Sequence, residues 1–78
     1  MNRQQIENVV ITVLSTVLKC EVDELGSRET LPQWDSLKQI EVIFAIEDEL
    51  NLQFPEEALP DLNSVAQIVD AAEALYAA

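Results

Sequence analysis

A serine at the start of an expected helix is the residue of this chain best placed to carry chemistry. Asp35 is a good helix N-cap residue, so Ser36 is expected in the first helical turn. The backbone N–H groups of a first turn lack helical partners, and the helix dipole is positive there. A phosphate on the Ser36 hydroxyl would therefore be electrostatically favoured, although most serines at helix starts are only polar first-turn residues. Ser27, in the preceding loop, is a second candidate.

Other kinds of catalytic or metal site find no support in the residues. The chain has no His, so it cannot form a Ser/His/Asp constellation, and Cys20 has no histidine base to activate it as a nucleophile. We expect Cys20 to be a small buried apolar side chain. With Gly26 as its one glycine, the chain cannot form a Gly-rich phosphate loop. The calcium-ligand spacing fails after Asp23, and the paired Asp48 and Glu49 belong on a convex helix surface. We therefore expect no enzyme and no metal site.

Four helical segments are expected to position Ser36. Apolar residues recur at spacings of three and four over residues 3–19, and a second helix runs from Asp35 to about Leu50. Glu56–Leu59 is expected to form one short helical turn before Pro60, and a last helix opens at Ser64. The sequence thus predicts an all-α fold, a small four-helix bundle with a long first loop and a short third helix, in a single domain over residues 1–78.

Local signals mark the ends of these segments and the long loop. Asn2 with Gln5, and Ser64 with Gln67, have the spacing of capping boxes, and Met1 with Ile6 could form a hydrophobic staple. Residues 20–35 have no clean period, and so long a loop in so small a domain is expected to be functional or fixed to the core. The residues expected to fix it are Leu25, Leu31 and Trp34.

The second helix carries two apolar faces. At about 100° per residue, one face holds Val42, Ile43, Ile46 and Leu50 and must be the core side. A different face holds a second apolar set with acids beside it; this set comprises Leu37, Ile40 and Phe44, and the acids are Glu41, Glu47 and Asp48. One alternative is that the second set completes the core against the long loop. The other is an exposed apolar stripe, ringed by carboxylates, that meets a partner with a basic rim.

Charge and composition limit the possible partners. Four Lys and Arg against fifteen Asp and Glu give a net charge of −11, which excludes a simple nucleic-acid binder. The chain also has no polybasic segment that could bind an anionic membrane. No apolar run is long enough for membrane insertion. A single cysteine and no visible signal peptide lead us to expect a cytoplasmic protein. We also expect a monomer, with little stability margin, whose stability rises with salt.

Asp35-Ser36-Leu37, followed by Ile40, Glu41 and the run 42–50, resembles the phosphopantetheine attachment motif of acyl carrier proteins, and the order of helices is similar over essentially the whole chain. The resemblance implies that Ser36 carries a covalent 4′-phosphopantetheine, attached by a phosphopantetheinyl transferase that uses coenzyme A and magnesium. Asp35 would help to organise the metal of the transferase. The thiol of the arm would then shuttle acyl groups as thioesters between acyl-loading and acyl-processing enzymes with basic docking surfaces.

The resemblance also assigns a partner-binding set on the second helix and leaves alternatives open. This set comprises Leu37, Lys38, Ile40, Glu41, Phe44, Glu47 and Asp48. Trp34, Lys38 and the segment after Pro60 depart from the usual fatty-acid carriers, which favours a discrete carrier of a specialised polyketide, lipid or envelope pathway. The alternatives are an aminoacyl or peptidyl carrier loaded by an adenylating ligase, and a helical protein-binding module whose Ser36 is never modified.

Overall fold

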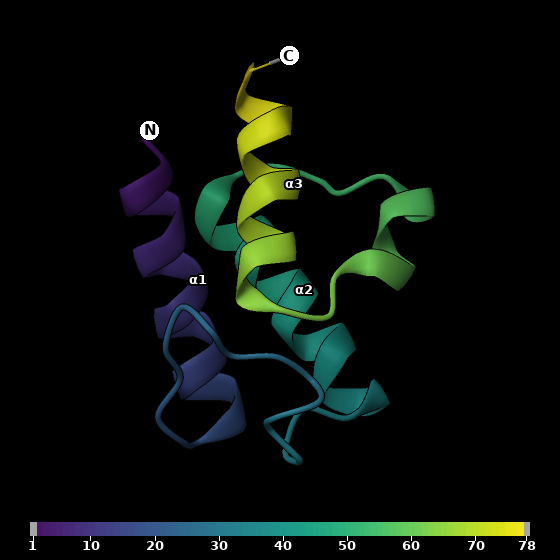
Figure 1. The fold of residues 1–78 in the computed structure, drawn as a ribbon. Helices are drawn as coiled ribbons and strands as arrows, with labels where there is room; N and C mark the ends of the chain where they lie inside the picture. Colours follow the sequence, from purple (N-terminus) through teal and green to yellow (C-terminus); the bar gives the residue numbers. More distant parts are fainter. Residues whose placement is uncertain (1, 78) are drawn as a thin grey trace.

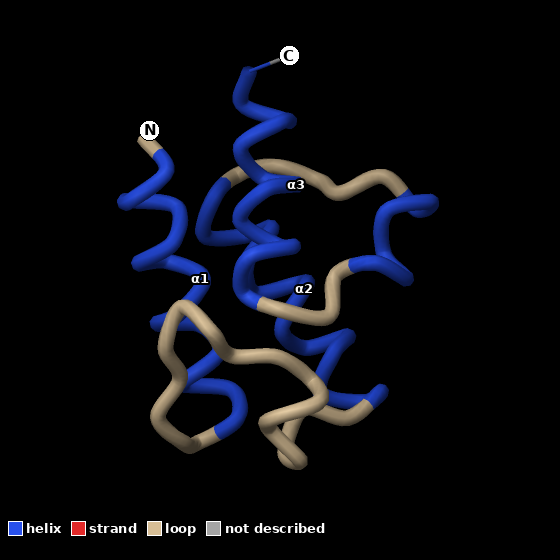
Figure 2. Tube along the Cα trace, in the orientation of Figure 1, coloured by secondary structure: helices blue, strands red, loops and turns tan. Residues whose placement is uncertain are grey.

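The computed structural model describes residues 2–77 and has the expected all-α architecture. Its helices are α1 (Arg3–Leu18), α2 (Ser36–Leu50), the 3₁₀ helix η1 (Glu56–Asp61) and α3 (Val65–Ala77). As Figure 1 is drawn, α1 runs downward, α2 and α3 run back upward, and η1 lies to one side. The helix α1 packs against both α2 and α3. Figure 2 shows that a long loop without helices connects the end of α1 to the start of α2. The small four-helix bundle predicted from the sequence is confirmed.

Local chemistry sets the ends of α1 and α2. The side chain of Asn2 accepts a hydrogen bond from the backbone N–H of Gln5, and the Gln5 side chain accepts one from the Asn2 backbone, so the predicted capping box is confirmed. Both helices end where a non-glycine residue adopts a left-handed conformation, Lys19 with φ 57° and Asn51 with φ 54°. The expected staple of Met1 on Ile6 lies outside the described residues.

The short third helix differs from the expected single turn before a proline. It is a 3₁₀ helix that continues through Pro60 to Asp61. A proline removes one donor, but a short 3₁₀ helix has few bonds to lose, and its ends are held by bonds from Ala58 N to Pro55 O and from Leu62 N to Leu59 O. Pro60 therefore does not end the helix.

The start of α3 carries part of a capping box. The Ser64 hydroxyl accepts from the backbone N–H of Gln67 at 3.2 Å, as expected. The Gln67 side chain, however, accepts from the backbone N–H of Asn63 at 3.1 Å and from the Ser64 hydroxyl, rather than from the backbone of Ser64. Near the other end of α3, the Tyr76 hydroxyl donates to the carbonyl of Leu50 and ties this helix to the end of α2.

One apolar core joins the helices and part of the long loop. Of the three side chains expected to fix the loop, Trp34 is buried at 2% exposure and Leu31 is half-buried against the core, whereas Leu25 is 80% exposed. The Leu25 expectation is wrong because Asp23 Oδ1 accepts from the Leu25 backbone N–H at 2.9 Å and forms a local turn that leaves this side chain outside. The buried core comprises Ile6, Val10, Val13, Leu14, Leu18, Trp34, Val42, Ile43, Ile46, Leu50, Phe54, Leu62, Val65, Ile68, Val69 and Ala72.

Candidate functional site

The first turn of α2 presents Ser36 to solvent. Asp35 has the extended backbone of an N-cap, and its Oδ1 accepts from the backbone N–H of Lys38 at 2.9 Å. Its carbonyl accepts from Gln39 N at 2.9 Å, which closes the first turn. Ser36 is then the first helical residue, and its side chain is exposed. The predicted N-cap is confirmed, and the Ser36 hydroxyl is accessible to another protein.

Trp34 and Gln39 hold the start of α2 against the rest of the fold. The buried indole of Trp34 donates through Nε1 to Gln39 Oε1 at 2.6 Å. The Gln39 amide nitrogen donates in turn to the carbonyl of Leu62 at 2.7 Å, just before α3. The bulky residue next to Asp35 is therefore part of the core, and a chain of two hydrogen bonds positions the turn that bears Ser36.

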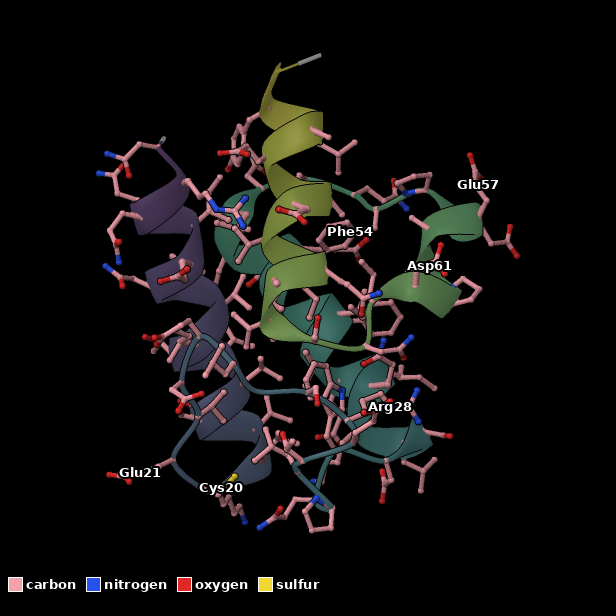
Figure 3. All side chains as sticks on the ribbon, viewed as in Figure 1. Cys20, Glu21, Arg28, Phe54, Glu57 and Asp61 are labelled. Carbon is pink, nitrogen blue, oxygen red and sulfur yellow. The ribbon has the colours of Figure 1, made fainter. Side chains whose placement is uncertain are left out.

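Arg28 lies beside the serine, although the sequence analysis did not single it out. Its Nη2 is 3.5 Å from Ser36 Oγ, its Nη1 is 3.2 Å from Asn63 Oδ1, and its Nε is 3.4 Å from the carbonyl oxygen of Trp34. Figure 3 shows Arg28 beside the lower turns of α2. A cation eight residues before the serine was a weak signal in the sequence. The contact with Asn63, 35 residues along the chain, depends on the tertiary fold.

Backbone hydrogen bonds on either side of Ser27 fix the long loop to the segment before α3. The Arg28 backbone N–H donates to the Asn63 carbonyl at 2.9 Å, and the Val65 N–H donates to the Gly26 carbonyl at 2.9 Å. These two bonds flank an isolated antiparallel bridge between Ser27 and Ser64. The loop residues before the site are thereby attached to the start of α3.

The second apolar set of α2 is exposed and does not complete the core. Leu37, Ile40 and Phe44 are 75%, 55% and 67% exposed. We call these three residues the apolar face of α2. Glu41 and Asp48 beside them are also exposed, and Lys38 Nζ lies 3.5 Å from Glu41 Oε2. The positive charge of Lys38 is therefore partly balanced on the helix itself.

Glu47 differs from the other acids of the expected partner-binding set. It is half-buried, and its Oε2 accepts from the backbone N–H of Phe54 at 2.8 Å. The carboxylate thus fixes the segment that follows α2, where Phe54 enters the core. This role in the fold was not expected from the sequence, which placed Glu47 only at the rim of the apolar face.

The geometry favours a hydroxyl that receives a group from another protein. Asp35 Oδ1 already caps the helix, and no His, Cys, Asp or Glu cluster suited to a metal ion occurs within residues 2–77. Cys20 is half-buried at the end of α1, and Figure 3 shows it well apart from Arg28. An apolar groove between α1 and α2, lined by Val9, Val13, Val17 and Ala45 among others, does not include Ser36. The Ser36 hydroxyl is thus exposed on the first turn of α2 and lies outside this groove.

Comparison with known proteins agrees with this description. A family model described as the phosphopantetheine attachment site matches residues 8–72. An acyl carrier protein of Guillardia theta is 29% identical over 73 residues, which cover 90% of each chain. An acyl carrier protein of Cyanidioschyzon merolae is also 29% identical over 73 residues, covering 90% of this chain and 80% of that protein. None of the helices in the described part of the chain has the length and apolar character needed to cross a membrane.

Proposed function

Since this chain belongs to the phosphopantetheine attachment-site family, we propose that Ser36 is the residue that bears the 4′-phosphopantetheine arm. Members of this family act as carriers and not as enzymes. The observation that carries the assignment is the exposed Ser36 hydroxyl in the first turn of α2, directly after a capping Asp35.

The residues around Ser36 fit a phosphate ester. Unpaired N–H groups and the positive end of the helix dipole favour an anion at this turn, and Arg28 adds a guanidinium 3.5 Å from Ser36 Oγ. The hydroxyl is exposed, so that a transferase can reach it. Ser27, the other candidate, is half-buried, and its hydroxyl lies 3.3 Å from Thr30 Oγ1. It is therefore the less accessible of the two.

Attachment would replace one phosphorus–oxygen bond by another. Ser36 Oγ attacks the phosphorus of coenzyme A that bears the pantetheine, and the bond from that phosphorus to the bridging oxygen breaks. The adenosine bisphosphate half leaves, and the hydroxyl proton passes to a base of the transferase. Asp35 can contribute to the transferase's magnesium site through its second oxygen, Oδ2, because its Oδ1 already accepts from Lys38 N.

The arm supplies a thiol that holds an acyl group as a thioester, so the chain serves enzymes that load and process that group. We propose that these partners recognise the apolar face of α2 and its acids through basic docking surfaces, with weak contacts that release quickly. The partner-binding set is Leu37, Lys38, Ile40, Glu41, Phe44, Glu47 and Asp48. We further propose a single-domain, monomeric, cytoplasmic carrier. Trp34 and Lys38 favour a specialised polyketide, lipid or envelope pathway.

The proposal is tested by intact mass after incubation with coenzyme A, magnesium and a broad-specificity phosphopantetheinyl transferase. The parent protein should gain the mass of one phosphopantetheinyl group, and Ser36→Ala should gain none. Ser27→Ala is the matched control, because it removes a nearby hydroxyl, and it should be modified like the parent. If the folded, initially unmodified parent gains no mass, the assignment is wrong, and the apolar face of α2 becomes the docking surface of an unmodified helical module.

A further inference from the structure

We propose that Arg28 binds the phosphate of the group carried on Ser36 and thereby fixes the direction in which the arm leaves the protein. The inference rests on the proposed attachment to Ser36 and adds a phosphate-binding residue to it. Nη2 of Arg28 is 3.5 Å from Ser36 Oγ. Because esterification bonds the phosphorus directly to that oxygen, the free phosphate oxygens come within hydrogen-bonding reach of the guanidinium.

The charge of Arg28 is not balanced by a carboxylate. Arg3 pairs with Asp70 at 2.7 Å, and Lys38 pairs with Glu41 at 3.5 Å. Within residues 2–77, no Asp or Glu oxygen lies within 4.0 Å of the Arg28 guanidinium nitrogens, whose hydrogen-bond acceptors are neutral oxygens. In a chain of net charge −11, such a guanidinium next to a serine hydroxyl is suited to an arriving anion. Arginine also binds phosphate through two N–H groups at once.

The guanidinium is already held in place before any phosphate arrives. Its Nε and Nη1 contact Trp34 O and Asn63 Oδ1, and the backbone of Arg28 is bonded to the Asn63 carbonyl. The side chain is half-buried. Binding a phosphate therefore costs little additional side-chain entropy. The phosphate would be held on the side of Ser36 where the long loop meets the start of α3.

A purely structural role for Arg28 predicts a different pattern of effects. If its only role were to join the loop to α2 and α3, removing it would destabilise the unmodified and the modified protein equally. A phosphate-binding residue instead contributes more to the modified protein. The difference in stability between the two forms, and not the stability of either one, separates these roles.

The experiment measures urea unfolding of the unmodified and the phosphopantetheinylated protein for the parent, Arg28→Gln, Arg28→Lys and Arg3→Gln. An ion pair that solvent partly screens predicts that modification of the parent lowers its unfolding equilibrium constant by about twofold to fivefold. Arg28→Gln should lose this change and Arg28→Lys should keep part of it. Arg3→Gln, the matched loss of one arginine charge elsewhere, should keep all of it. An equal change in Arg28→Gln and in the parent overturns the inference.

A second measurement on the parent alone covers the case in which Arg28→Gln does not fold or is not modified. The side-chain N–H resonances of Arg28 should shift on modification, whereas those of Arg3 should not. Unchanged Arg28 resonances overturn the inference. Intact mass comes first in every case: a parent that is not modified contradicts the assignment of Ser36, whereas a modified parent with no effect at Arg28 contradicts only the role of Arg28.

Discussion

Gln39 is the side chain that joins the attachment turn to the segment before α3. It accepts from the Trp34 indole at 2.6 Å and donates to the Leu62 carbonyl at 2.7 Å. Gln39→Met keeps the length and helix propensity of the side chain but leaves both partners unpaired. The Trp34 indole N–H and the Leu62 carbonyl would lose their partner, and water cannot fully replace it because both groups are partly buried. We therefore expect the free energy of unfolding to fall by about 1–3 kcal/mol.

Urea denaturation tests the role of Gln39, since a lower midpoint at unchanged slope reports lost stability. Gln53 is the control: it is exposed, and within residues 2–77 its side chain makes no hydrogen bond to the protein. Gln53→Met should change the free energy of unfolding by less than about 0.5 kcal/mol. If both variants behave alike, the two hydrogen bonds of Gln39 do not support the turn.

The sequence predicted the helix start of the candidate site and missed the contacts that residues distant in the chain make there. Asp35 and Ser36 were identified because an N-cap is defined by neighbours along the chain. Arg28 and Gln39 were not identified, because their roles depend on Asn63 and on the Leu62 carbonyl, 35 and 23 residues away. Nothing in a single sequence states which loop residue meets which residue before the last helix.

At the scale of the element, the two sets of apolar side chains on α2 lie in different environments. Ile46 is fully buried, whereas Phe44, two residues earlier, is 67% exposed. Ile46→Ala should lower the free energy of unfolding by about 2–5 kcal/mol, because it leaves a cavity in the core. Phe44→Ala should change the free energy of unfolding by less than about 0.5 kcal/mol. If the apolar face of α2 docks partners, Phe44→Ala should instead raise the KM of the transferase for this protein.

Denaturation and transferase kinetics on the same two variants separate a role in the core from the proposed role in docking. Ile46→Ala, assayed where it remains folded, is the control for a general effect of a mutation in α2, and its KM should stay near that of the parent. A Phe44→Ala protein with parent stability and parent KM would show that the exposed phenylalanine has no part in docking to the transferase.

Helical periodicity predicted α1, α2 and α3 well because each buries a stripe of apolar side chains at a regular spacing. It was less informative for η1 and for the long loop. Pro60 stays inside a 3₁₀ helix, since so short a helix depends on few hydrogen bonds. Leu25 is apolar yet exposed, because an Asp23 turn decides its direction. In these segments, local turn chemistry outweighs hydrophobicity.

At the scale of the whole molecule, uncompensated negative charge should govern how stability depends on salt. The chain carries a net charge of −11 within a radius of gyration of 11.2 Å, close to the Debye length of about 10 Å at 0.1 M salt. Like charges at such distances repel each other more in the folded state than in the expanded chain. Raising NaCl from low concentration to 0.5 M should therefore raise Tm by about 5 °C, equivalent to ~1 kcal/mol.

A charge-neutralised variant tests whether repulsion causes that dependence. Glu21, Glu24 and Glu29 lie on the long loop and are exposed, and within residues 2–77 their side chains have no hydrogen-bond or ion-pair partner. Changing all three to Gln removes three negative charges without breaking a contact. The variant should have a higher Tm at low salt and a smaller increase on adding NaCl, because less repulsion is left to screen. An equal increase in parent and variant would assign the effect of salt to strengthened burial of apolar surface instead.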